Sequence, residues 1–116
     1  MKRDWDLIRV LLVELESSEG ALCTRDVEGY SEEAVNYHMD LLIGAGLADG
    51  ECRTGIGGSG TTCHLKKLTW AGHEFLDGIR SKSAWNAVKK IAQDKGLSLS
   101  FEVVKLAAAH VIKTMF

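Results

Sequence analysis

Residues 31–47, SEEAVNYHMDLLIGAGL, carry the side chains of this chain that are best placed to recognise a ligand. Apolar residues recur there at intervals of three and four, which predicts an amphipathic helix over 31–45 with one buried stripe: Val35, Met39, Leu42 and Ile43. The opposite face is expected to expose the polar residues Glu32, Glu33, Asn36, Tyr37 and Asp40. In a DNA major groove, Asn36 would pair with adenine and Tyr37 would contact a phosphate, whereas the three carboxylates would repel phosphates. This face therefore suits either double-stranded DNA or a basic protein partner, and its charge favours the protein.

A second group of candidate contacts lies in two strand-like segments, Leu47–Thr54 and Thr61–Leu68, which flank the sequence GIGGSG and predict a β-hairpin. The hairpin holds the densest positive charge outside the last third of the chain: Arg53, His64, Lys66 and Lys67. Such side chains reach DNA phosphates from a hairpin, although two or three charges give only weak, salt-sensitive affinity. The alternative is that the lysines keep an exposed strand from pairing with another chain.

Two patterns in the hairpin imitate chemical sites. The loop GIGGSGTT has the glycine spacing of a phosphate-binding loop, but Thr61 stands where the lysine is required, so we expect a hairpin tip. Cys52, Cys63 and His64 are zinc-binding residue types, but three ligands without a CxxC pair do not form a closed site. The chain has three cysteines, and this odd number predicts reduced thiols that pack as small core residues. We therefore expect no metal and no cofactor.

The spacing of polar residues nominates no catalytic group. No nucleophile stands with a base and no pair of carboxylates is placed in a pocket, so we expect that the protein is not an enzyme. His38 borders the apolar stripe of its helix and is expected to be a hydrogen-bonded structural histidine.

Composition limits the partners that this chain can have. With 116 residues, 46% of them hydrophobic, it suffices for one domain with its own core. The net charge of −2 conceals an asymmetry, because residues 1–50 carry four basic and eleven acidic side chains whereas residues 81–116 carry six lysines against Asp94 and Glu102. A pI of about 6.1 argues against a general polyanion binder, so any nucleic-acid contact must be local. The chain lacks an apolar run long enough for a membrane span or a signal peptide, so we expect a cytoplasmic protein without membrane contact.

Further helices are predicted on both sides of the hairpin. The first begins at Asp4 or Asp6, ends at Ser17–Gly20 and carries a broad apolar stripe: Trp5, Leu7, Ile8, Leu11, Leu12 and Leu15. Residues 19–30 suit a short strand or a single helical turn. After a cap at Thr69, another helix is expected to place on the core Trp70, Phe75, Leu76 and Ile79. Ser83 opens the next helix, which Gly96 closes and which buries Trp85, Val88, Ile91 and Ala92.

The last predicted helix, from Ser100 onward, carries a heptad-like stripe of Phe101, Val104, Ala108, Val111 and Met115. One interpretation is that the stripe forms a homodimer. The other is that it covers the first helix within the monomer.

The order of these elements resembles a winged helix. Specific runs also resemble a family of short proteins from bacteria and their prophages that is known only as a domain of unknown function: MKRDWDLIRVLLVELE, YSEEAVNYHMDLLIGAGL, LTWAGHEFLDGIR and SLSFEVVKLAAAHVIK. The resemblance implies a winged-helix-like fold and a phage or prophage setting, and it transfers no catalytic residue.

We therefore expect an α+β domain, mainly α with a small β-hairpin, built as a winged helix with a truncated helix-turn-helix and two extra C-terminal helices. Its single domain, 1–116, would consist of a core at 1–80 and a helical extension at 81–116. The expected function is that of a DNA-associated regulator, and the alternative is a protein-interaction or dimerisation module that does not bind DNA.

Overall fold

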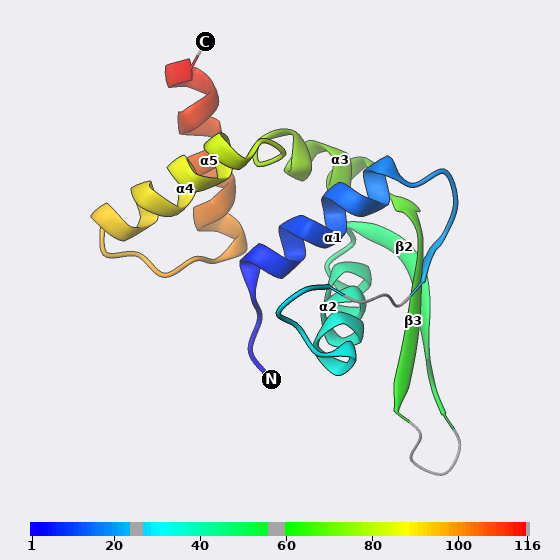
Figure 1. Cartoon of the computed structure of the whole chain (residues 1–116). Helices are drawn as coiled ribbons and strands as arrows, with labels where there is room; N and C mark the ends of the chain where they lie inside the picture. The colour runs from blue at the N-terminus through cyan, green and yellow to red at the C-terminus, as the bar shows by residue number, and fades with distance from the viewer. Residues whose placement is uncertain (24–26, 56–59, 116) are drawn as a thin grey trace. The chain divides into compact units, whose positions relative to one another are not determined.

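The computed structural model describes residues 1–23, 27–55 and 60–115, with the side chains of 114 and 115 left out. The described residues form five helices and one three-stranded antiparallel sheet (Figure 1). They divide into two compact units, Met1–His73 and Glu74–Phe116, and the boundary falls inside helix α3 (Trp70–Asp77).

Helix α1 (Trp5–Ser17) begins where the sequence predicts. Asp4 is its N-cap, because a carboxylate oxygen of Asp4 accepts hydrogen bonds from the backbone N–H groups of Asp6 and Leu7 at 2.9 and 3.2 Å. The predicted apolar stripe is confirmed, since the side chains are buried: Trp5, Leu7, Ile8, Leu11, Leu12 and Leu15.

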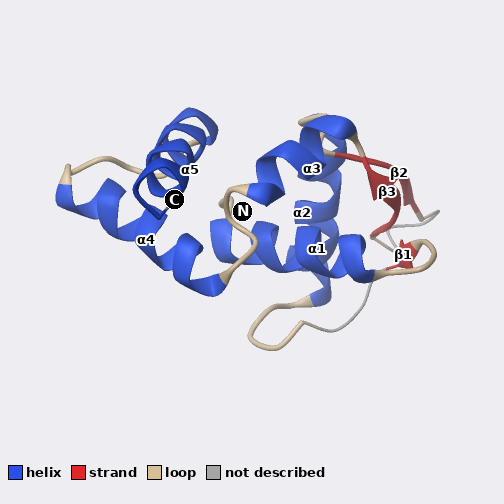
Figure 2. Cartoon of the chain, turned by 90° about the horizontal axis from the view of Figure 1, so that it is seen from above, coloured by secondary structure: helices blue, strands red, loops and turns tan. Residues whose placement is uncertain are grey.

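A three-stranded sheet packs against the helices of the first unit. Strands β1 (Leu22–Cys23), β2 (Ala48–Thr54) and β3 (Thr61–Leu68) lie in the order β1-β3-β2. Helices α1 and α2 (Glu32–Gly44) pack on the same side of the strands (Figure 2). Of the two alternatives expected within 19–30, a short strand or a single helical turn, the structure has the strand β1, and the hairpin has the predicted bounds to within one residue.

The register of the hairpin determines which side chains face the helices. Cys52 pairs with Cys63 and Glu51 with His64, while a bulge between Asp49 and Gly50 shifts the ladder. A side chain at Gly50 would collide with the backbone oxygen of His64, so the strands approach too closely there for any other residue.

Helix α2 is capped at both ends as predicted. The Ser31 hydroxyl accepts a hydrogen bond from the Ala34 N–H at 3.1 Å, and Gly46 takes a left-handed conformation with φ of 76° after the last turn. Val35, Met39 and Leu42 are buried, whereas Ile43 is half-buried.

The second unit contains the C-terminal half of α3, α4 (Lys82–Asp94) and α5 (Phe101–Met115), with α4 packed against α5. The Phe75 and Phe101 rings stack with their centroids 5.0 Å apart. The N-cap of α4 is Ser81, two residues before the predicted Ser83, and Ile91 is half-buried where we expected it in the core.

Helix α3 begins as predicted but turns one aromatic residue outward. Thr69 Oγ1 accepts the Gly72 N–H at 3.0 Å, so Thr69 is the expected cap. Trp70 is 81% exposed, which contradicts its prediction as a core residue. At roughly 100° per residue, the buried Phe75 and Leu76 lie on the side of α3 opposite Trp70, and Ile79 is buried just after the helix.

Candidate interaction groove

Asp4, Tyr30 and His38 form a polar junction that joins the start of α1 to α2, the helix that carries the candidate site. The Asp4 N–H donates to His38 Nε2 at 2.7 Å, and His38 Nδ1 lies 2.8 Å from the Ala34 carbonyl oxygen. Because a backbone N–H can only donate, Nε2 accepts and the ring proton is on Nδ1. His38 is 1% exposed, so its prediction as a structural histidine is confirmed.

Tyr30 completes this junction by donating its hydroxyl proton to Asp4 Oδ2 at 3.0 Å. The pKa of Tyr30 is raised to about 12, first by burial and then by the hydrogen bond to Asp4 and the negative charges of Asp4 and Asp6. The sequence had suggested Asp4 as a helix cap, but no local pattern links Asp4 to Tyr30 or His38.

Asn36 faces the sheet, so its prediction as an exposed contact residue is wrong. Its side chain is buried, and Oδ1 accepts the Cys63 N–H at 3.0 Å. Because Asn36 Oδ1 binds this backbone N–H, it is not available to read a base.

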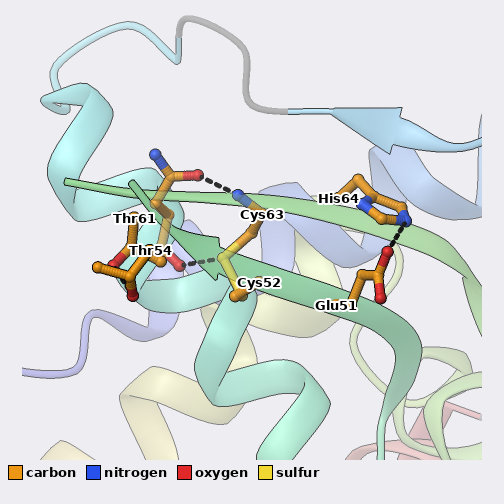
Figure 3. The surroundings of a disulfide bond; sticks show 7 residues. Glu51, Cys52, Thr54, Thr61, Cys63 and His64 are labelled. Atoms are coloured by element: carbon orange, nitrogen blue, oxygen red, sulfur yellow. Dashed lines mark hydrogen bonds and ion pairs between the residues drawn. A yellow bond between two sulfur atoms is a disulfide. The ribbon is translucent and has the colours of Figure 1, made fainter. Parts of the chain in front are cut away.

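Cys52 and Cys63 form a disulfide, which corrects the prediction of reduced, packed thiols (Figure 3). Because the Cys63 N–H points to α2, the two cysteines oppose each other at a position without interstrand hydrogen bonds, where cross-strand side chains are closest. Their Cα atoms are 4.0 Å apart. Cys23, in contrast, is an exposed free thiol.

The outward residues of α2 line an open groove of about 720 Å³ against the start of β3. Its described lining contains three carboxylates and no lysine, arginine or histidine: Met1, Glu32, Glu33, Asn36, Tyr37, Asp40, Gly60, Thr61 and Thr62. Glu33, Tyr37 and Asp40 follow one another at intervals of four and three, so they share one helix face. Tyr37 is 38% exposed and thus offers part of its ring between two carboxylates.

The candidate cations of the hairpin lie outside this groove. Arg53 is exposed and pairs with the Glu51 carboxylate at 3.2 Å, while His64 Nε2 is 3.7 Å from the same oxygen. Lys66 and Lys67 are exposed on β3. Side chains alternate along β3, so His64 lies on the sheet face opposite Cys63, and the two do not converge on one metal (Figure 3).

No group of three or more His, Cys, Asp or Glu side chains is placed to hold a metal within the described residues. The loop compared with a phosphate-binding loop lies partly outside those residues, at 56–59, but the Gly55 N–H donates to the Gly60 carbonyl oxygen at 2.7 Å across its base.

The stripe predicted to form a dimer lies on the inner side of α5. Val104, Ala108 and Val111 are buried by the chain itself, and Phe101 stacks on Phe75. Ala108 also approaches Gly78 closely. The side chain of Met115 lies outside the described part. The homodimer stays a prediction, but four of its five proposed contacts already have partners in their own chain.

The sequence analysis identified the acidic helix face that lines the groove but not the second wall. Thr61 and Thr62 show no recognisable signal, because their position beside α2 depends on the hairpin register and on the Asn36 contact.

Together, these features define a small α+β protein whose candidate site is an acidic groove between a helix and a hairpin. Residues 2–98 match the model of the family DUF2513, described as a hypothetical protein, and the chain belongs to this family. An uncharacterized protein of Haemophilus influenzae is 39% identical over 118 residues, which covers 99% of this chain and 98% of the relative. No solved structure matches the chain. Every helix in the described residues is too short or too polar to cross a membrane.

Proposed function

We propose that this chain is a protein-interaction module whose acidic groove binds a basic segment of a partner protein. The observation that carries this proposal is the lining of the groove, which combines the carboxylates of Glu32, Glu33 and Asp40 with the partly exposed ring of Tyr37. A guanidinium group pairs with carboxylates and stacks on aromatic rings, so an arginine-containing segment fits both features. The first unit, residues 1–73, supports this choice with seven basic against twelve acidic side chains.

The arrangement of elements supports a winged-helix-like fold for the module. In this proposal α2 corresponds to the recognition helix of a winged helix, and the element order α1-β1-α2-β2-β3-α3 with the sheet order β1-β3-β2 supports it. The described residues between β1 and α2 contain no helix, which agrees with a truncated helix-turn-helix. Because α2 presents carboxylates, such a helix suits a basic protein better than phosphates.

The expected affinity is modest and depends on salt. Exposed ion pairs contribute about 0.2–1 kcal/mol each and are screened over about 8 Å at physiological ionic strength. Binding should therefore weaken steeply as salt is added.

The test is fluorescence anisotropy with a labelled oligoarginine peptide at low salt. Replacing Glu33→Gln together with Asp40→Asn should weaken binding about tenfold, which corresponds to about 1.4 kcal/mol. The matched control, Glu19→Gln with Asp49→Asn, removes the same two charges at exposed sites outside the groove and should change affinity little. Equal losses in both double variants, or no binding by the wild type, would overturn the proposal.

The second candidate function is that of a DNA-associated regulator that contacts phosphates through the hairpin. The exposed Lys66 and Lys67 favour it, whereas Arg53 is already paired and Asn36 is buried. A salt titration with random duplex DNA tests it, because Lys66→Glu with Lys67→Glu should lower both the affinity and the salt slope. Replacing Glu32 and Glu33 by Ala should leave DNA binding unchanged or strengthen it. A prophage setting stays a prediction from the family resemblance.

A further inference from the structure

We propose that the Cys52–Cys63 disulfide is a redox site that controls one wall of the groove. In the oxidised form it holds the end of the hairpin against α2, and its reduction loosens that wall and weakens binding of the basic segment. The binding part of this inference rests on the proposed function, whereas the effect on the hairpin does not.

The disulfide lies at the point where the hairpin meets α2. Cys63 is 2% exposed, and its backbone N–H is held by Asn36 Oδ1 at 3.0 Å. Asn36 also lines the groove, and the two residues that precede Cys63, Thr61 and Thr62, form the opposite wall. A conformational change at the disulfide should therefore affect both walls, because Cys63 is hydrogen-bonded to Asn36 and is adjacent to Thr62.

Beyond the disulfide, the ladder between β2 and β3 continues for two more pairs, Arg53 with Thr62 and Thr54 with Thr61. Thr54 pairs with Thr61 through hydroxyl groups 3.4 Å apart, and Gly55 donates to Gly60 at 2.7 Å. The side chains of Arg53, Thr54, Thr61 and Thr62 are all exposed, so this end of the hairpin buries little apolar surface. Loss of the covalent bond should therefore raise the rate at which the ladder opens here.

The surroundings of Cys63 also accommodate the reduced form. Its sulfur lies 3.4 Å from the backbone oxygen of Asn36. A disulfide sulfur has no proton to donate, but a Cys63 thiol would donate one to this oxygen. The reduced state thus has a hydrogen bond available without rearrangement of α2.

The exposure of the two cysteine residues sets the order of the reaction. Cys52 is half-buried and Cys63 is buried, so a thiolate of a dithiol reductant reaches Cys52 first. The S–S bond between Cys52 and Cys63 breaks, a mixed disulfide forms at Cys52, and Cys63 leaves as a thiolate that takes a proton. The second thiolate of the reductant then forms its own disulfide and releases Cys52, so two electrons pass from the reductant to the protein.

The test compares the oxidised protein with protein reduced by dithiothreitol, in a Cys23→Ser background that removes the free thiol. Hydrogen-exchange mass spectrometry should show faster exchange in the hairpin peptide spanning Cys52–Cys63 after reduction, with α1 unchanged. Binding of the oligoarginine peptide should weaken at least threefold. Adding Cys52→Ser should reproduce the reduced behaviour and abolish the response to dithiothreitol, while Cys23→Ser alone should respond fully.

Several results would overturn the inference. Thiol counting that finds Cys52 and Cys63 unpaired in protein purified in air removes its premise. Hairpin exchange that is the same in both redox states, or faster exchange with unchanged peptide affinity, shows that the disulfide does not control the groove. If neither form binds the peptide but exchange responds to reduction, the proposed function fails while the control of the hairpin by the disulfide stands.

Discussion

Asp4 joins three segments of the first unit. One carboxylate oxygen caps α1, the other accepts the Tyr30 hydroxyl, and the Asp4 backbone N–H binds His38 on α2. Hydrogen bonds to a charged acceptor are stronger than neutral ones, so this carboxylate contributes more than an ordinary cap.

Replacing Asp4 by Ala should therefore lower the free energy of unfolding by about 2 kcal/mol, the sum of a lost cap and a lost hydrogen bond. Asp4→Asn is the control, because an asparagine still caps a helix but lacks the charge, and about half of the loss should be recovered. Thermal or urea unfolding measures both. An Asp4→Ala protein as stable as the wild type would show that the junction is not stabilising.

The raised pKa of Tyr30 predicts how the junction responds to alkaline pH. Folding favours the neutral phenol, because its pKa rises from 10.0 to about 12. The stability that this shift contributes is fully present below pH 10 and is lost as the pH rises toward 12.

In a Tyr37→Phe protein, Tyr30 is the remaining tyrosine, so its ionisation can be followed by tyrosinate absorbance. The midpoint should lie near 12 in the folded protein and near 10.0 after unfolding in urea. A midpoint near 10.0 in the folded protein contradicts the hydrogen bond to Asp4.

At the scale of elements, α3 is positioned by its close approach to the chain that enters β2. A Cβ added at Gly72 would collide with the Leu47 backbone oxygen and lie 3.3 Å from the Leu68 side chain. Backbone atoms cannot move aside as a flexible side chain does, so no residue larger than glycine fits at position 72 without a shift of the backbone.

Gly72→Ala should lower the free energy of unfolding by about 2 kcal/mol or more. Gly44→Ala is the matched control, because Gly44 lies in a helix with open space around it, and the change should stabilise the protein by up to about 1 kcal/mol. Urea unfolding of the two variants in parallel measures whether the free energy of unfolding falls for Gly72→Ala and rises for Gly44→Ala. Equal effects of the two substitutions would refute the steric argument.

A helix or strand could be predicted from the sequence where the residues of that element alone determine its bounds and its buried face. The period of three and four located the buried faces of α1 and α2, and Asp4, Ser31 and Gly46 marked helix ends through local chemistry. The hairpin followed from two strand-like runs around a glycine-rich connection.

The remaining features depend on the pairing of segments far apart in sequence. Asn36 is buried where its side chain binds the backbone of Cys63 on β3, and the disulfide forms because Cys52 and Cys63 share a register position. Neither fact is visible in a local pattern. The groove was therefore half predicted: its acidic helix was identified, but not the Thr61 and Thr62 wall that Asn36 positions.

At the scale of the whole molecule, charge is divided between the two compact units. Residues 74–116 carry seven basic against four acidic side chains, the opposite balance to residues 1–73. The pI of the whole chain therefore describes neither unit, and binding experiments with basic or acidic probes need variants in each unit to be interpretable.

The last prediction concerns whether α5 serves its own chain or a second copy. Val104 is fully buried within the chain on a helix that packs against α4, whereas Leu106 on the same helix is 70% exposed. A buried carboxylate without a partner is strongly destabilising, so Val104→Glu should unfold the second unit, and Leu106→Glu should leave it folded. Circular dichroism and sedimentation of both variants beside the wild type measure fold and mass together. A dimeric wild type that Val104→Glu converts into a folded monomer would show instead that the stripe pairs with a second copy, because only a residue at an interface between folded chains tolerates a charge in this way.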